Sequence, residues 1–281
     1  MDRLNLKIPG FSIACKAWGN PEKPTILALH GWLDNANSFL PIAPYLENDF
    51  YLIAVDLPGH GHSSHLPPGC HYHFFDGIFI VIEILNALQI DKVHLLGHSM
   101  GACLASLVGG VLPERFLSLM LIEGLGPFSH PGETACQQLR EYAHFLTQKS
   151  KKSKGYDHLE SAALARAFKG YVSIDIAKTL CERSLVEKQG RFYWRHDQRL
   201  LARSPLRMTE MQILSCLMEI KAKTYLLIAN QGFSFDAEII RDRIRAVRNL
   251  TLKKVDGGHH IHMEQPEVVS QLLTDFMINT N

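Results

Sequence analysis

With 281 residues, 46% hydrophobic and 20% charged, the chain is long enough for one large domain with a sizeable core, and its composition excludes a disordered or fibrous protein. Its 29 Lys and Arg side chains nearly balance 28 Asp and Glu, so the basic surplus that binds nucleic acid or an anionic membrane is missing. We therefore expect no nucleic acid and no membrane among its partners.

The N-terminus and the cysteines bear on location. Residues 1–10 lack the apolar run of a signal peptide, and no segment approaches the roughly 18 apolar residues that cross a bilayer. The six cysteines are scattered and form no CxxC pair, which is typical of reduced, mostly buried thiols. The sequence therefore predicts a cytoplasmic protein.

Short apolar runs alternate with helical patterns over the first 125 residues. Four runs fit strands that are buried on both faces of a parallel sheet: Thr25–Leu29, Tyr51–Val55, Val93–Leu96 and Ser118–Ile122. Residues 76–88 and 101–112 fit the helices that cross between such strands. This alternation predicts an α/β fold with a doubly wound, mostly parallel sheet.

The strand rhythm stops near Gly126 and resumes at Thr224–Ala229 and Leu250–Val255, with helical patterns at 237–247 and 266–278. Between about 126 and 220 only helical patterns are found, for example at 140–147, 159–168 and 208–218. An all-helical insertion between parallel strands is typical of a cap over the carboxyl ends of the sheet. We predict a core of residues 1–126 and 221–281 and a helical cap of residues 127–220, with a solvated Lys-rich loop at 149–154.

The segment Gly97-His98-Ser99-Met100-Gly101 matches G-x-S-x-G. A predicted strand enters it and a predicted helix leaves it, and this setting makes the match far more specific than the five residues alone. In this context the segment resembles the nucleophile elbow of the α/β-hydrolases, where the turn lifts the serine hydroxyl above the sheet. We predict Ser99 as the nucleophile.

The resemblance implies the oxyanion hole. In α/β-hydrolases the residue after a His-Gly pair donates its backbone N–H to the developing oxyanion, and the residue after the nucleophile donates a second. His30-Gly31 follows the predicted strand at 25–29, so the donors are expected to be Trp32 and Met100.

Three histidines stand close together in Gly258-His259-His260-Ile261-His262-Met263-Glu264-Gln265-Pro266. α/β-Hydrolases commonly end in a similar G-H-x-x-H-(L/M)-E-x-P segment. The match implies His259 as the base and His262 as structural support, and it leaves His260 as a cleft or surface residue. A metal site is not expected here, nor among His60, His62, His65, His71 and His73, since a G-H-G turn explains the first two more simply.

The carboxylate expected to orient His259 departs from the pattern that is common in α/β-hydrolases. Most members carry it in a segment like L-L-I-x-G-x-x-D, but here Phe233 stands in the Asp position. Asp236 is an alternative, although it also fits the N-cap of the helix at 237. Glu123 directly follows the strand that ends at Ile122, and haloalkane dehalogenases and the related coelenterazine luciferases carry a catalytic Glu in a similar place. We predict Glu123, with Asp236 as the alternative.

A narrower group fits most of the chain. His30–Phe39 resembles the H-G-W-L-D-N-A-x-S-F opening of the serine hydrolase-like proteins, and the segments 56–63, 121–127 and 193–200 fit as well. The resemblance implies an α/β-hydrolase fold with the helical cap inserted after the sixth strand. It implies a hydrolase of carboxylic esters or related acyl compounds and names no substrate.

Arginines recur every four residues through the last third of the predicted cap, at Arg191, Arg195, Arg199, Arg203 and Arg207. One interpretation is a site for a carboxylate or phosphate of the substrate. The other is a solvated face with one or two ion pairs, which is the more common fate of a charge run.

These features predict a serine hydrolase that cleaves a small acyl substrate through an acyl-enzyme on Ser99, without cofactor or metal. A thioesterase, a lactonase and a carbon–carbon bond hydrolase are alternatives within the same chemistry. A hydrolase-fold ligand receptor with little turnover is the alternative from another class.

Overall fold

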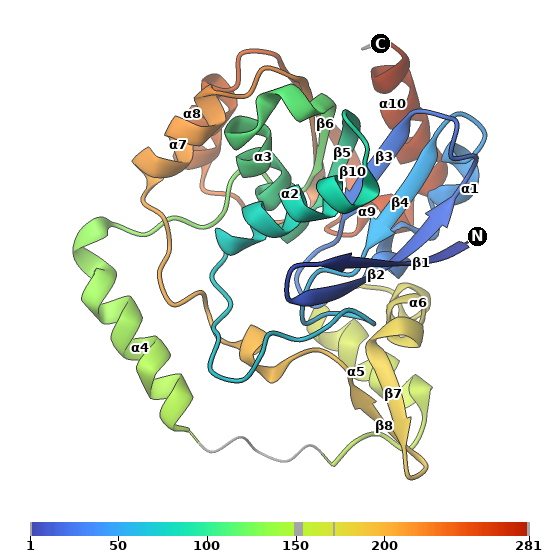
Figure 1. Ribbon diagram of the computed structural model, residues 1–281, viewed down its shortest axis with the longest axis vertical. Coiled ribbons are helices and arrows are strands. Elements are labelled where there is room, and N and C mark those ends of the chain that lie inside the picture. The colour runs from blue at the N-terminus through green and yellow to red at the C-terminus, as the bar shows by residue number, and fades with distance from the viewer. Residues whose placement is uncertain (1, 149–153, 171, 280–281) are drawn as a thin grey trace.

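The computed structural model describes residues 2–148, 154–170 and 172–279 (Figure 1). One eight-stranded sheet runs through the molecule in the order β1-β2-β4-β3-β5-β6-β9-β10. The strands are β1 (Asp2–Ile8), β2 (Phe11–Trp18), β3 (Thr25–Leu29), β4 (Tyr51–Val55), β5 (Val93–His98), β6 (Phe116–Ile122), β9 (Lys223–Gln231) and β10 (Leu250–Gly258). From β4 to β10 all neighbours are parallel, which confirms the predicted mostly parallel sheet.

Helices cover both faces of this sheet because successive side chains of each strand point to opposite faces. In β3, Leu27 and Leu29 join a core with α2 (Asp76–Leu88), α3 (Met100–Val111), α7 (Glu210–Met218) and α8 (Ala237–Ala246). Ile26 and Ala28 of the same strand join a second core with α1 (Ala43–Leu46), α9 (Ile261–Glu264) and α10 (Pro266–Ile278). Figure 1 shows α2 and α3 on one side of the strands and α10 on the other.

The first two strands were not expected. β1 and β2 form an antiparallel hairpin, and β2 pairs antiparallel with β4 at the edge of the parallel strands. From Ile13 to Ala17 buried and half-buried residues alternate along β2, so one face of this hairpin packs on the core and the other is partly open to solvent. Its signal in the sequence is alternation alone, which is weaker than a continuous apolar run.

The segment between β6 and β9 contains α4 (Ala135–Thr147), α5 (Leu159–Gly170), α6 (Ile174–Ser184) and a hairpin of β7 (Leu185–Lys188) and β8 (Arg191–Trp194). The expectation that this segment is all helical is therefore wrong. Gln189 and Gly190 turn the hairpin with φ of 53° and 72°, a conformation typical of two-residue hairpin loops. Residues 149–153 of the predicted Lys-rich loop lie outside the described residues.

Parts of this segment differ in what they pack against. α5, α6 and the hairpin share a small core of their own, around Ala163, Ala177 and Cys181. α7, at the end of the predicted cap range, instead packs on α3 and buries Ile213 and Leu217 in the main core. α4 stands apart at the edge of the molecule in Figure 1, and Tyr142 is its one buried residue.

None of the helices in the described ranges is both long and apolar enough to span a bilayer. All six cysteines are free thiols; Cys15 and Cys181 are buried, Cys103 and Cys216 are half-buried, and Cys70 and Cys136 are exposed, so the expectation of buried thiols holds in full only for the first two.

Candidate active site

Ser99 occupies a sharp turn between β5 and α3. Its backbone has φ 51° and ψ −114°, a strained conformation that costs on the order of 1–3 kcal/mol. A side chain at Gly101 would collide with the carbonyl oxygen of Leu29, and one at Gly97 would come within 2.5 Å of Ala102. The two glycines therefore let α3 pack closely against the sheet and hold the turn in place.

Three side chains from distant parts of the chain form a continuous hydrogen-bonded series. His259 lies in the turn between β10 and α9, and Glu123 directly follows β6. Nε2 of His259 is 2.9 Å from Ser99 Oγ, and Nδ1 is 2.9 Å from Glu123 Oε2. Because an ionised carboxylate only accepts, Nδ1 carries the proton and Nε2 is free to accept from the Ser99 hydroxyl. The structure thus brings Ser99, His259 and Glu123 together.

Glu123 is held from two sides. It is 2% exposed and has φ 57°, so its backbone is strained like that of Ser99. Its Oε1 accepts the N–H of Ala229 and its Oε2 accepts the N–H of Phe233, both at 2.6 Å. These two donors, with His259, leave the buried carboxylate well paired and fix its orientation.

Asp236, the alternative acid, is engaged elsewhere. Its Oδ1 accepts the backbone N–H groups of Glu238 and Ile239, each at 3.0 Å, at the start of α8. This is the N-cap geometry that satisfies the first free donors of a helix. The structure therefore places Asp236 at the start of a helix, whereas Glu123 is the carboxylate within hydrogen-bond distance of His259.

Trp32 and Met100, the predicted oxyanion donors, follow β3 and Ser99. Trp32 lies in a tight turn, and the residue that follows it, Leu33, has φ 60°. Within the described ranges, the backbone N–H groups of Trp32 and Met100 have no hydrogen-bond acceptor, so both are available to a substrate oxygen. The Trp32 indole is 52% exposed, and its Nε1–H donates to the carbonyl of Leu200 at 3.0 Å.

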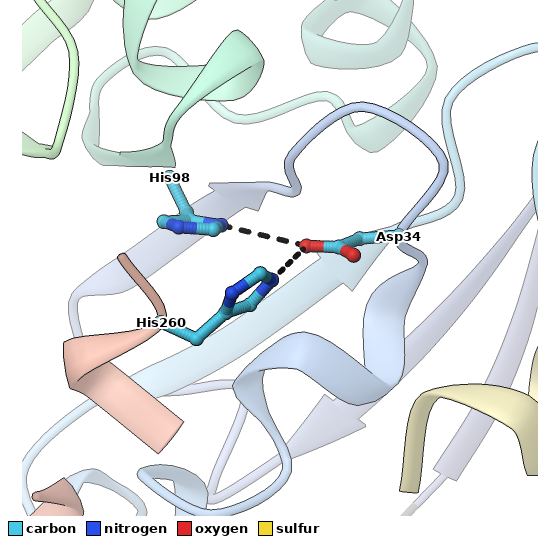
Figure 2. A group of neighbouring side chains, drawn as sticks. All are labelled: Asp34, His98 and His260. Carbon is cyan, nitrogen blue, oxygen red and sulfur yellow. Dashed lines mark hydrogen bonds and ion pairs between the residues drawn. The ribbon is translucent and has the colours of Figure 1, made fainter. Parts of the chain in front are cut away.

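Behind His259 lies a buried network of Asp34, His98 and His260 (Figure 2). The interpretation of His260 as a cleft or surface residue is wrong, since it is 6% exposed and its Nε2 is 3.1 Å from Asp34 Oδ2. His98 donates Nε2–H to the backbone carbonyl of His259 at 2.9 Å, so in the neutral ring its Nδ1 carries no proton and lies 3.5 Å from the same Asp34 oxygen without a hydrogen bond. Arg166 of α5 pairs with the other oxygen of Asp34. Asp34 therefore joins α5 to His260, the residue that follows His259.

Burial sets the ionisation of these groups. Burial lowers the pKa of His98 to about 4 and holds that of His262 well below its usual value. Burial alone would raise the pKa of Asp34, but the neighbouring His260 and Arg166 outweigh it and hold that pKa well below its usual range. His262 is hydrogen-bonded to Ser38 Oγ at 2.8 Å, in keeping with a structural role.

The side chains of Asp34, His98 and His260 have the spacing of a metal site. Oδ2 of Asp34, Nδ1 of His98 and Nε2 of His260 lie within 4.8 Å of one another. The guanidinium of Arg166 already balances the charge of this carboxylate, so we interpret the group as an ion-pair and hydrogen-bond network. No second group of three potential ligands occurs in the ranges that the structure describes, and the histidines between 60 and 73 do not assemble one.

The five regularly spaced arginines do not form a stripe. Arg191 and Arg199 form ion pairs with neighbouring aspartates, and Arg195 donates to a backbone carbonyl. Arg203 and Arg207 lie in the segment between η4 (Gln198–Leu201) and α7 and line a cavity there.

Comparisons with known sequences agree with this architecture. The family model of the α/β hydrolase fold matches residues 24–266. A serine hydrolase-like protein of Danio rerio is 30% identical over 98% of this chain and 87% of its own length. A serine hydrolase-like protein of Dictyostelium discoideum is 32% identical over 95% of this chain and 79% of its own length.

Solved structures extend the likeness to the whole chain. A hypothetical protein from Pseudomonas aeruginosa PAO1 superposes with a TM-score of 0.93 at 32% identity, and the match covers 99% of this chain and 100% of that one. The thioesterase domain from the curacin biosynthetic pathway superposes with a TM-score of 0.86 at 26% identity, covering 98% and 99% of the two chains.

Proposed function

Because the chain belongs to the α/β-hydrolase family and is a hydrolase, we propose that it cleaves carboxylic esters of small molecules through an acyl-enzyme on Ser99. The observation that carries this proposal is the hydrogen-bonded series from Ser99 Oγ through His259 to Glu123, with 2.9 Å at each step. A nucleophile bonded to a base, which is in turn oriented by a carboxylate, is the arrangement that activates serine.

In the proposed first step, His259 Nε2 takes the proton of the Ser99 hydroxyl as Oγ attacks the acyl carbonyl. The carbonyl oxygen gains the negative charge and is bound by the backbone N–H groups of Trp32 and Met100, each donor stabilising the transition state by ~3 kcal/mol. His259 then gives the proton to the leaving oxygen, and the bond between it and the acyl carbon breaks. Glu123 stays ionised and stabilises the imidazolium that forms in between.

In the second step a water molecule takes the place of the leaving group. His259 removes its proton as the oxygen attacks the acyl carbon, and collapse of the second tetrahedral intermediate returns the proton to Ser99 and frees the acid. These bond-making and bond-breaking steps need no cofactor or metal.

We also propose that the part of residues 127–220 that precedes α7 acts as a cap over the site, at the ends of the parallel strands. Its α5 and α6 are anchored to the loops that follow β3 and β4. Arg183 of α6 pairs with Asp56 through Nε at 2.9 Å and Nη2 at 2.8 Å, and Asn35 donates to Leu180 and Ser184. Arg166 of α5 adds the ion pair with Asp34.

The test is hydrolysis of p-nitrophenyl esters from acetate to decanoate by the wild-type protein, by Ser99→Ala and by Ser215→Ala. Ser215 is an exposed residue of α7 and serves as the matched control. We expect multiple turnover that is lost in Ser99→Ala and kept in Ser215→Ala, and intact mass should detect the acyl group on Ser99. Turnover that survives in Ser99→Ala would refute the mechanism.

Thioester hydrolysis is the second candidate, because a thioesterase domain is 26% identical over nearly the full length of both chains. The same acyl-enzyme would form, with a thiol as the leaving group. Comparing an oxygen ester with the thioester of the same acyl group ranks the two activities. A hydrolase-fold receptor would instead be acylated once or release product very slowly.

A further inference from the structure

A cavity lies between α4 and the segment that leads from η4 to α7, and Ser99 is not among the residues that line it. Its volume is about 210 Å³, and it is lined by His130, Tyr142, Arg203 and Arg207 among others. Both arginines come from the regularly spaced series in the sequence. The cavity therefore collects cationic side chains that the catalytic mechanism does not use.

Arg207 is the unusual group in this cavity. It is half-buried, and in the ranges that the structure describes it forms no ion pair with an Asp or Glu side chain. Its Nη1–H donates to His130 Nε2 at 3.2 Å, and its guanidinium lies 5.4 Å from the ring centre of Phe128. Neither contact neutralises its charge, and a guanidinium offers further N–H donors in a planar fork.

The surroundings of Arg207 favour an added anion. Burial lowers the pKa of Arg207, the neighbouring Arg203 adds to this effect, and the Glu141 carboxylate opposes it only in part. Arg203 itself is 3.7 Å from Glu141, and both side chains are largely exposed, so this pair is weak. One acidic side chain thus faces two arginines, and the cavity keeps an uncompensated positive charge.

A row of aromatic rings connects Arg207 to the catalytic histidine. The Phe128 ring under Arg207 lies 5.6 Å from the ring of Phe233, and the Phe233 ring lies 6.1 Å from that of His259. In the proposed mechanism His259 gives its proton to the leaving atom, so the leaving group lies beside His259. The row therefore runs from the leaving-group side of Ser99 to the cationic cavity.

We propose that this cavity binds a carboxylate or phosphate on the leaving-group part of the substrate. The substrate class is then an ester or thioester whose alcohol or thiol carries an anionic group beyond an apolar spacer. The inference rests on the proposed function for the position of the leaving group, and it names the residues that select that group. Arg207 is the specificity residue, because its planar fork pairs with an oxyanion.

The experiment compares leaving groups that differ in one anionic group. Butyrate esters of 4-hydroxyphenylalkanoic acids with one to five methylenes are paired with the matching carboxamides, and S-butyryl-4′-phosphopantetheine is paired with S-butyryl-pantetheine. The first series reports on carboxylates and the second on phosphates. We expect kcat/KM at least tenfold higher for the anionic member of one pair, with the best spacer length giving the distance to the cavity.

Variants locate the effect. Arg207→Gln is expected to lower the anionic-to-neutral ratio at least tenfold, and Arg207→Lys to lower it less, since charge is kept and the fork is lost. Arg140→Gln is the matched control, because Arg140 is an exposed residue of α4 outside the cavity. Its ratio should stay within twofold of wild type. If Arg207→Gln does not fold, the anionic-to-neutral ratio of kcat/KM for Arg207→Lys tests the proposal instead.

A ratio near one in every pair, or a ratio that Arg207 substitution leaves unchanged, would overturn the proposal. Direct binding separates this failure from failure of the proposed function. Calorimetric titration with 4-(4-hydroxyphenyl)butyrate should give binding that Arg207→Gln weakens at least tenfold. Such binding without any ester turnover would support the anion site and reject the hydrolysis mechanism, whereas equal binding by both proteins would reject the site.

Discussion

The backbone N–H of Phe233 donates to Oε2 of Glu123, the same oxygen that faces His259 Nδ1. Phe233 stands where many α/β-hydrolases carry their aspartate, and here its backbone N–H holds the carboxylate that follows β6, which is the acid of the proposed mechanism. A side chain at Gly232 would collide with this carboxylate. The loop after β9 is therefore shaped around Glu123, and in the proposed mechanism the acid that orients His259 comes from the end of β6 instead of from this loop.

Glu123→Gln should lower kcat by roughly 10³–10⁴ while the fold is kept. The amide cannot accept from His259 and from both backbone N–H groups at once, so the histidine loses its orienting partner. The measurement is kcat on the best p-nitrophenyl ester, with circular dichroism to check folding. Full activity in this variant would remove Glu123 from the mechanism.

Asp236→Ala should leave kcat within about twofold and lower the free energy of unfolding by about 1 kcal/mol, the usual loss when a helix N-cap is removed. Urea denaturation measures the second quantity. A thousandfold fall in kcat, with Glu123→Gln fully active, would instead assign the acid to Asp236.

Gly232→Ala should lower kcat at least tenfold, because the added methyl group displaces the Glu123 carboxylate from His259. Gly132→Ala is the matched control, since a Cβ there would have its nearest neighbour at 3.7 Å. Both variants are assayed on the same ester. Equal activity of the two would show that the loop after β9 does not position Glu123.

Much of the fold could be predicted from the sequence because its signals are local. The buried strands at 25–29 and 51–55 and the helix at 266–278 have the bounds that their apolar patterns indicated. Ser99 and His259 were predicted from short motifs at strand ends, and the structure brings the two side chains within hydrogen-bond distance. The β1–β2 and β7–β8 hairpins were missed because their strands show alternating or mixed polarity, which is a weak signal in the sequence. Such segments become strands only when they pair with a neighbouring strand.

The rest depends on contacts between distant segments. The environment of His260 is set by Asp34, which lies more than two hundred residues earlier, so its burial was not apparent. The regular spacing of the arginines left open a substrate site or a solvated face, and the structure shows a hairpin strand and a 3-10 helix that direct the arginines to different neighbours. Only the three-dimensional arrangement distinguishes Arg207, which forms no ion pair with an acidic side chain in the described ranges, from Arg199, which forms one with Asp197.

Asp34→Asn should lower the free energy of unfolding by about 3–5 kcal/mol, because Arg166 would keep a charge without its partner. Urea denaturation of the single variants and of Asp34→Asn with Arg166→Met gives the coupling between them. We expect the double variant to be more stable than additivity predicts. A loss below 1 kcal/mol in Asp34→Asn would show that the network contributes little.

Stability should fall steeply as the pH drops from 6.5 to 4.5. Burial lowers the pKa of His60 to about 3 and that of His94, His98 and His196 to about 4. Unfolding returns each group to about 6.5, so in this window the unfolded chain binds more protons than the folded one. The free energy of unfolding is then highest above pH 6.5 and is lost on acidification, by up to about 1.4 kcal/mol per pH unit for each histidine. Urea denaturation at half-unit pH steps measures this slope. His94→Gln, at a site bonded to Ser118, should reduce the slope by one histidine's share, and a flat profile in the wild type would contradict the assignment of these histidines as neutral in the folded state.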